Sequence, residues 1–373
     1  MSITSSPVDT AGPGQEAYLN PSKSKSKYTS TSSPISIGTN EGHLPPELIG
    51  WLKPWPRDTP DDILRHELKT KGVVHIKNAM PREYVLGIRE RFFQRVAPSG
   101  VLKSGTDPVD GIFCGGNPED FVWPKVLPGD NGQVNSMTLD DMAKQGDYTY
   151  LAAQVHFEDW TNAFAGNERE CRSSPSSPSF SIVAQDMAGG MTRDLTWIET
   201  GELSGYIARS YWAAKSATGV HYDQLFLRHG PPTAITAWIP IGDCPPQGGG
   251  LMYLDDSLGL GRDLEEGFTR LSEEKHLTDD ERNSAYNSNM TAKGGLGNDA
   301  GDFACSRANG RKWLIGDYEA GDAVFHHMYA IHASGLNNDP HGRIRFSADL
   351  RYVDGDQAYD HRWTNPFYPG DGL

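Results

Sequence analysis

The sequence lacks the features that mark several large classes of protein. Its four cysteines include no CxxC pair, which excludes a zinc knuckle or a thioredoxin-like motif and predicts reduced thiols. No run approaches the roughly 20 apolar residues of a membrane span. The first residues also show no basic segment followed by an apolar one. We therefore expect a soluble, cytoplasmic protein without a membrane partner.

Basic charge is also scarce. The 34 Lys and Arg residues stand against 49 Asp and Glu residues, which gives a formal net charge of −15. Binding to nucleic acid or to an anionic membrane requires a basic face that neutralises phosphates, and the sequence shows none. We interpret the acidic balance as a source of solubility and expect a small-molecule substrate rather than a nucleic acid. A homodimer is compatible with this composition.

Turn-forming residues, in contrast, are plentiful. The chain has 41 Gly and 25 Pro, which favours many turns over long helices. From about residue 180 onward, short β-type runs dominate, among them FSIVAQ, GYIARSYW, TAITAWIPI, LMYL, DAVFHH and RIRFSADLRYV. Many short strands separated by turns are typical of a barrel or sandwich. The pattern predicts a mainly β fold with flanking helices (α+β).

The N-terminal half carries the expected helices. The segment DTPDDILRHELKTKG predicts a helix capped by Asp58 or Thr59, and the apolar run VVHI that follows it predicts a strand. HFEDWTNAF is a further helix candidate. In MPREYVLGIRERFFQRV, apolar residues recur at four-residue steps, the spacing of one helix face; they are Tyr84, Ile88, Phe92 and Val96.

Composition also predicts the domain organisation. Residues 1–45 are rich in Ser, Thr, Pro, Gly and Lys and nearly lack periodic apolar residues, so we expect a disordered tail. Residues 46–373 are expected to form a single domain. Within it, polar helix-like sequence at about 257–310 interrupts the β-type runs and is interpreted as an insertion between strands.

A candidate metal site begins at His221 and Asp223, which are two residues apart. If GVHYDQLFL is a strand, both side chains project from the same face. A His-x-Asp pair is common by chance, so a third ligand is needed. His332 is the preferred one, because small residues follow it and let a ligand approach. The other downstream candidates are His326, His327, His341 and His361; for the adjacent pair we expect strand packing or hydrogen bonding.

Two histidines and one carboxylate on one face of an octahedron leave three positions free. Two of these accept a bidentate 2-oxo acid and the third accepts O2. Strand alternation after His332 places Arg343, Arg345 and Ser347 on one face. An arginine fork binds a carboxylate in bidentate fashion, and we assign this role to Arg343. For Arg345 and Arg351 we expect surface salt bridges.

These residues resemble the phytanoyl-CoA dioxygenase family of iron and 2-oxoglutarate oxygenases. The resemblance is carried by HYD (221–223), by TAITAWIPIGDCPPQGGGLMYL (233–254) and by GDAVFHHMYAIHASGLNNDPHGRIRFSADLRY (321–352). It implies a double-stranded β-helix (jelly-roll, cupin-like) core in which His221, Asp223 and His332 bind Fe(II). Arg343 matches the arginine that binds the far carboxylate of 2-oxoglutarate, with Arg345 as the alternative if the register slips by two. Ser334 and Trp238 match further residues of that site.

The resemblance implies an Fe(II)- and 2-oxoglutarate-dependent dioxygenase with O2 as co-substrate. Because Asp223 stands where related halogenases have Gly or Ala, chlorination is not expected. We expect a specialised-metabolite tailoring enzyme that oxidises an unactivated C–H bond of a small molecule, by hydroxylation, desaturation or oxidative cyclisation. One alternative is an amino-acid-oxidising or amino-acid-cyclising member of the same family. The other is a non-catalytic or non-oxidative metal-binding jelly-roll protein. Four aromatic residues line a pocket or belong to the core: Tyr211, Trp212, Tyr222 and Phe226.

Overall fold

The computed structural model describes residues 35–116, 121, 148–155, 158–166, 192–197, 217–225, 227–228, 230–283 and 295–354. Its helices are α2 (Asp61–Lys71), α3 (Arg82–Val96), α5 (Tyr148–Gln154), α6 (Asp159–Gly166), α9 (Leu258–Glu274), α10 (Asp279–Asn283) and α11 (Ala300–Arg307). Its 3-10 helices are η1 (Pro46–Leu48), η2 (Ala97–Ser99), η3 (Pro108–Asp110) and η7 (Asp223–Leu225). None of the described helices combines the length and apolar character that crossing a bilayer requires.

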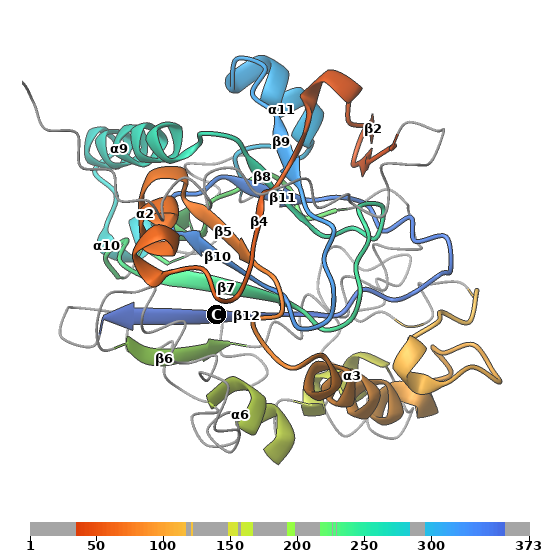
Figure 1. The fold of residues 1–373 in the computed structure, drawn as a ribbon. Coiled ribbons are helices and arrows are strands. Elements are labelled where there is room, and N and C mark those ends of the chain that lie inside the picture. Colours follow the sequence, from red (N-terminus) through yellow and green to blue (C-terminus); the bar gives the residue numbers. More distant parts are fainter. Residues whose placement is uncertain are drawn as a thin grey trace, which may run out of the picture. The chain divides into compact units, whose positions relative to one another are not determined.

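The strands, shown in Figure 1, are β1 (Gly38–Thr39), β2 (Gly42–His43), β3 (Ile49–Trp51), β4 (Pro54–Trp55), β5 (Val73–Ile76), β6 (Thr192–Trp197), β7 (Ile235–Pro240), β8 (Leu251–Leu254), β9 (Trp313–Ile315), β10 (Ala323–His327), β11 (His332–Ser334) and β12 (Ser347–Asp354). A six-stranded sheet has the order β4-β5-β10-β7-β12-β6, and a four-stranded sheet has the order β11-β8-β9-β3. From β9 to β12, consecutive strands alternate between the two sheets. This order is consistent with a double-stranded β-helix, and the mainly β prediction is confirmed.

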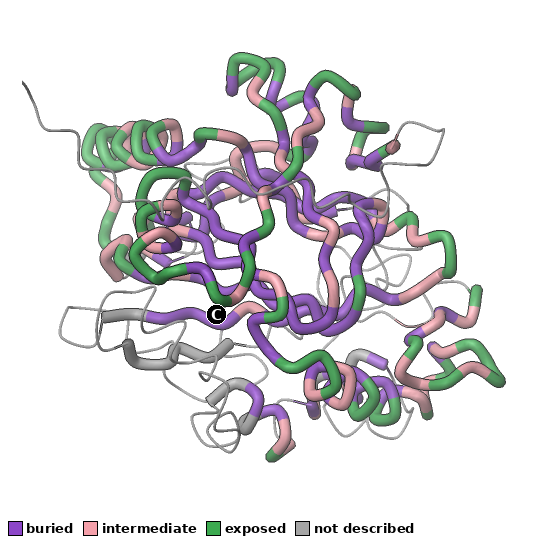
Figure 2. The backbone as a smooth tube through the Cα atoms, viewed as in Figure 1, coloured by how far each residue is buried: buried purple, intermediate pink, exposed green. Residues whose placement is uncertain are grey.

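Strand alternation divides the apolar residues among three clusters. Trp238 on β7 and Val324 on β10 join Tyr253 from β8 in one cluster, so these side chains lie between the sheets. Their strand neighbours Ala237 and Phe325 belong to a second cluster, on the helix-covered face of the six-stranded sheet. The third cluster covers the other face of the four-stranded sheet. In Figure 2 the central strands β5, β7, β8, β10 and β11 are accordingly buried along most of their length.

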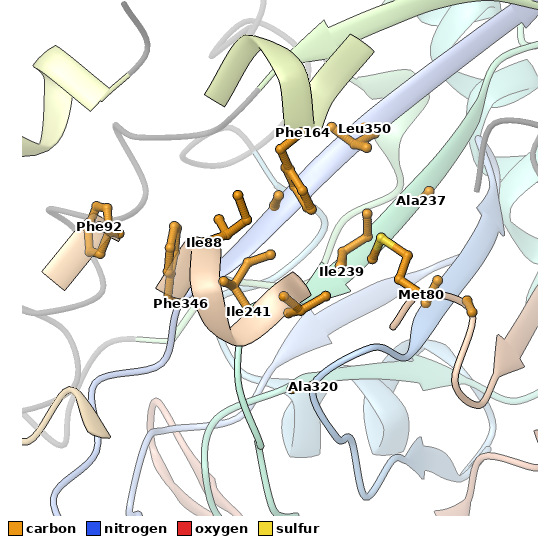
Figure 3. Close-up of a cluster of buried hydrophobic side chains, with 14 of the residues drawn as sticks. Met80, Ile88, Phe92, Phe164, Ala237, Ile239, Ile241, Ala320, Phe346 and Leu350 are labelled. Carbon is orange, nitrogen blue, oxygen red and sulfur yellow. The ribbon is translucent and has the colours of Figure 1, made fainter. Parts of the chain in front are cut away.

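Helix α3 packs on the outer face of the six-stranded sheet. Ile88, Phe92 and Val96 are buried as the four-residue spacing predicts, and Tyr84 packs partly buried at the same cluster. The ring of Phe92 stacks on Phe346 with 4.1 Å between centroids. Figure 3 shows both rings in the same cluster as Ile239 on β7 and Ile241 just after that strand. Helix α3 therefore packs both on the six-stranded sheet and on Phe346, the residue that directly precedes β12.

A buried guanidinium on α3 connects three separate segments. Arg89 donates hydrogen bonds to the backbone carbonyls of Val109, Ile241 and Ile344 at 2.6, 2.9 and 3.2 Å. Another goes to the carbonyl of Asp110 at 2.9 Å. Burial lowers the pKa of Arg89 to about 10, so it is still charged at neutral pH. The guanidinium thus provides donors for the buried carbonyls of Ile241 and Ile344.

Helix α2 begins later than the sequence predicts. Neither Asp58 nor Thr59 caps it; Pro60 holds the N-cap position without a side-chain hydrogen bond, and the helix starts at Asp61. It ends at Gly72, whose φ of 79° is the left-handed conformation that glycine adopts without strain. Strand β5 follows directly, as VVHI predicts. The candidate helix HFEDWTNAF is realised as α6 from Asp159, while FSIVAQ and GYIARSYW lie outside the described residues.

The ordered N-terminal part begins before residue 46. Strands β1 and β2 pair with each other, and Ile37 and Leu44 are buried in the cluster on the four-stranded sheet. Residues 35–45 therefore belong to the packed fold, and only residues 1–34 of the expected tail lie outside the described part of the chain.

Between β8 and β9 the chain forms the helices α9, α10 and α11, as the helix-like polar sequence at 257–310 predicts. Helix α9 lies against the turn that joins β10 to β11. A Cβ atom at Gly261 would be 2.2 Å from the carbonyl oxygen of Tyr329, so only glycine permits this approach. This contact supports the chain three residues before His332.

Candidate metal centre

The structure brings His221, Asp223 and His332 together. One ligand atom from each lies within 4.8 Å of the others. The Asp223 Oδ1 atom is 4.0 Å from His221 Nε2 and 3.5 Å from His332 Nε2. The two histidines are paired through their backbones, because each amide donates to the other's carbonyl, at 3.0 and 2.8 Å. This backbone pairing aligns two side chains that are far apart in the sequence.

The local structure at the first two ligands differs from the expected strand. The extended pairing ends at His221, and Asp223 starts the 3-10 helix η7. The Leu225 amide closes the turn on the Tyr222 carbonyl at 3.0 Å, and the Gln224 amide donates to the Met328 carbonyl at 3.1 Å. The turn, rather than strand alternation, therefore directs the carboxylate toward the two imidazoles.

Hydrogen bonds orient both imidazoles. His221 Nδ1 lies 2.8 Å from the Gly219 carbonyl, and His332 Nδ1 lies 2.9 Å from the Ala330 carbonyl. A carbonyl only accepts, so Nδ1 carries the hydrogen in each ring and Nε2 keeps its lone pair. Burial lowers the pKa of His332 to about 4, with the neighbouring His326 adding to the effect. Its imidazole is neutral at physiological pH, the form that binds metals.

Asp223 is buried, and its second oxygen is already engaged. Thr236 donates its hydroxyl to Oδ2, His326 Nε2 lies 3.3 Å from it, and Arg351 Nη2 lies 3.6 Å from it. Burial alone would raise the pKa of Asp223, but the Arg351 charge and the His326 hydrogen bond hold it well below its usual range. The carboxylate is therefore ionised, and Oδ1 faces the histidines.

This donor set fits Fe(II). Two neutral imidazole nitrogens and one carboxylate oxygen match the facial arrangement of non-haem iron oxygenases, which leaves positions for other ligands. Among the described residues, this is the group of His, Cys, Asp and Glu side chains close enough to share one metal ion. A closed four-ligand zinc site would need a further His or Cys ligand in that group.

Two of the expected 2-oxoglutarate residues, Ser334 and Trp238, are buried. Ser334 on β11 is buried, and its hydroxyl accepts from the Thr218 amide at 2.8 Å. Trp238 is buried between the sheets against Tyr318, with 4.8 Å between ring centroids. Both belong to the interior that the triad borders.

The two candidate arginines occupy different surroundings. Arg343 donates from Nε and Nη2 to the Asp339 carboxylate at 2.9 and 2.7 Å. Its side chain is 28% exposed. Arg345 is buried, donates to the Ser347 hydroxyl at 3.1 Å and lies 5.9 Å from the centre of the Trp238 ring. Strand β12 begins only at Ser347, so the expected strand through both arginines is wrong.

The expected surface salt bridges of Arg345 and Arg351 are also wrong, because both side chains are buried. His326 forms hydrogen bonds from a strand, as expected, whereas the partly buried His327 accepts from the Tyr329 amide. The exposed His341 lies in the turn after Asp339. Four other expected residues lie outside the described part of the chain: Tyr211, Trp212, Phe226 and His361.

Tyr222 is part of the core and not of the metal centre. It is buried in the cluster on the outer face of the four-stranded sheet, and its hydroxyl donates to Glu265 on α9.

Sequence reasoning did not identify Thr236 as part of the site. Its position two residues before Trp238 on the same strand is the signal that would have found it.

Comparison with known proteins gives one family and several solved structures. Residues 212–345 match the phytanoyl-CoA dioxygenase (PhyH) family. No curated protein matches the chain. The epimerase SnoN in complex with Fe3+, alpha ketoglutarate and nogalamycin RO is 16% identical, with 84% of this chain and 91% of that chain covered and a TM-score of 0.42. The carbocyclase SnoK from nogalamycin biosynthesis is 15% identical, with 82% and 89% covered and a TM-score of 0.41.

AviO1 from Streptomyces viridochromogenes Tue57 is 14% identical, with 80% of this chain and 97% of that chain covered and a TM-score of 0.37. At TM-scores below 0.5, none of these structures carries weight for the activity. The matched family and the triad instead define the class: this is an Fe(II)- and 2-oxoglutarate-dependent enzyme. The family match covers residues 212–345, which include the triad and both candidate arginines.

Proposed function

We propose that the enzyme oxidises an unactivated C–H bond of a small molecule, with His221, Asp223 and His332 as the iron ligands. The observation that carries this proposal is the group itself: two imidazoles and one ionised carboxylate whose ligand atoms lie within 4.8 Å of one another. When bound, iron with 2-oxoglutarate and O2 supplies the oxidising power, while 2-oxoglutarate is converted to succinate and CO2. Hydroxylation, desaturation and cyclisation are all compatible with this centre.

Arg345 is the proposed partner of the far carboxylate of 2-oxoglutarate. It is buried beside Trp238, in the interior that the triad borders, whereas the guanidinium of Arg343 already binds Asp339. A guanidinium in an interior binds a carboxylate more strongly than one exposed to water, because less solvent screens the pair. The Trp238 ring limits the space on one side of this guanidinium.

The residues of the chain itself bind the metal, orient its ligands and exclude water. The Gly219 and Ala330 carbonyls hold the two imidazoles in the metal-binding tautomer. Burial of Asp223 and His332 keeps bulk water from the centre. Within this interior a reactive site is protected from side reactions.

The test is an anaerobic titration with Fe(II) and then 2-oxoglutarate, followed by the weak visible charge-transfer band of the chelate. The wild-type protein should develop this band and, after O2 is admitted, form succinate. His221→Ala, Asp223→Ala and His332→Ala should each lose both signals. Full succinate formation by the His332→Ala protein would reject the assignment. His327→Gln, which changes a neighbouring histidine outside the triad, serves as the matched control.

A further inference from the structure

Three neighbouring strands present one side chain each to the same oxygen of Asp223. Thr236 on β7 is the backbone partner of both His326 on β10 and Arg351 on β12, so the three residues form one row across the sheet. All three reach Oδ2, while Oδ1 faces His221 and His332. The sheet register therefore fixes which carboxylate oxygen is left for a metal.

His326 is the member of this row with the most restricted orientation. Its Nδ1 lies 3.1 Å from the Tyr253 hydroxyl, and its Nε2 lies 3.3 Å from Asp223 Oδ2. An ionised carboxylate only accepts, so Nε2 carries the hydrogen and Nδ1 accepts from the phenol. The ring is thus held at both nitrogens. A threonine hydroxyl rotates freely by comparison, and the 3.6 Å Arg351 contact has no strict direction.

We propose that His326 is a positioning residue that turns Asp223 so that only Oδ1 binds the metal. The ring lies beside His332, with 4.6 Å between centroids, yet its Nε2 is directed at the carboxylate and it is not part of the triad. By occupying Oδ2, it prevents the carboxylate from binding through both oxygens and keeps a metal position open. This inference rests on the proposed ligation by Asp223.

The inference is tested by metal binding to the full-length protein, with Co(II) as the probe because its visible bands report the number and type of ligands. His326→Phe keeps the ring shape and removes both nitrogens. It should weaken Co(II) binding by about 10–100-fold, the usual effect of losing a group that orients a ligand. His326→Gln places an N–H close to the former Nε2 and should stay within about threefold of wild type. His326→Asn, whose N–H falls short of Asp223, should resemble His326→Phe.

Two controls separate the possible failures. His327→Gln, one residue away and outside this network, should bind Co(II) as the wild type does. If His326→Phe binds Co(II) as tightly and with the same spectrum as wild type, the positioning role is rejected. Equal affinities of the Gln and Asn variants reject it too, even if the Phe variant does not fold. Wild-type binding by Asp223→Ala would instead reject the ligand set proposed above.

Discussion

Arg343 and Arg345 are separated by a single residue but meet different partners. Asp339, which is itself buried, binds Arg343 from a turn four residues earlier in the chain. The Asp339 carboxylate offsets the effect of partial burial and raises the pKa of Arg343 further. Arg345 instead enters the interior beside Trp238. A ligand carboxylate would have to displace Asp339 to reach Arg343.

We therefore expect Arg345→Lys to raise the dissociation constant of 2-oxoglutarate by about 10–100-fold. Lysine keeps the charge but loses the fork, and a hydrogen bond to a charged group contributes roughly 1.5–3 kcal/mol. Arg343→Lys should stay within about threefold of wild type. Anaerobic titration of the Fe(II)-loaded variants with 2-oxoglutarate measures both values. A larger loss in Arg343→Lys than in Arg345→Lys would return the role to Arg343.

At the residue scale, the sequence predicted the triad because HYD (221–223) and, much later, His332 follow one another in the order of the family that they resemble. It did not predict the burial of Arg345 and Arg351. Whether an arginine is paired at the surface or enclosed depends on residues from other strands, such as Thr236, and on turns such as that of Asp339. These contacts arise only when the chain has folded.

Among the elements, the apolar strands and α3 were predictable because their burial follows a regular period. The helix η7 was not, since the run GVHYDQLFL has the β-type composition of its neighbours. Tertiary hydrogen bonds override that local preference, in particular the bond from the Gln224 amide to the Met328 carbonyl. The start of β12 was likewise shifted to Ser347 by the turn before it.

Gly261 allows a test of the close contact between helix α9 and the turn that precedes His332. Gly261→Ala should lower the free energy of unfolding by roughly 1–3 kcal/mol, because the added methyl meets the fixed Tyr329 carbonyl. Gly267→Ala on the same helix has space for the methyl and should raise it by about 0.5–1 kcal/mol. Urea unfolding measures both changes. Equal effects of the two substitutions would show that α9 does not press on this turn.

On the scale of the whole molecule, a buried carboxylate joins the N-terminal strand β5 to the strand that leads to the metal centre. Asp322, next to β10, accepts from His75 at 3.1 Å and from Lys77 at 2.6 Å. It also accepts from the backbone amides of Asn78 and Glu319. Burial opposes ionisation of Asp322, but these partners lower its pKa below the usual 3.8.

This cluster predicts a loss of stability in acid. Above about pH 4, Asp322 is ionised in the folded and the unfolded protein, and its full contribution is present. As the pH falls below that value, the unfolded chain takes up the proton first and stability declines. Burial also lowers the pKa of His75 below 6.5, so acidification from that pH favours the unfolded chain as well.

Asp322→Asn should cost roughly 2–3 kcal/mol at neutral pH, since the Lys77 and His75 partners lose the charge. Its stability should also change less than that of wild type between pH 4 and pH 2. Asp263→Asn, at an exposed position on α9, is the control and should behave as wild type. Denaturant unfolding at a series of pH values checks this, and a wild-type acid profile in Asp322→Asn would contradict it.

The strand order has a consequence for any attempt to transplant the catalytic segment into another protein. The family match ends at residue 345, before β12, and begins long after β5. Yet β10 is bonded on one side to β5, and β7 is bonded on one side to β12. A fragment limited to residues 212–345 would carry all three candidate metal ligands. It would, however, expose the edge of β10 that pairs with β5 and the edge of β7 that pairs with β12, and unpaired strand edges promote aggregation. The matched segment contains the three candidate ligands, but strands outside it complete the sheet beside them.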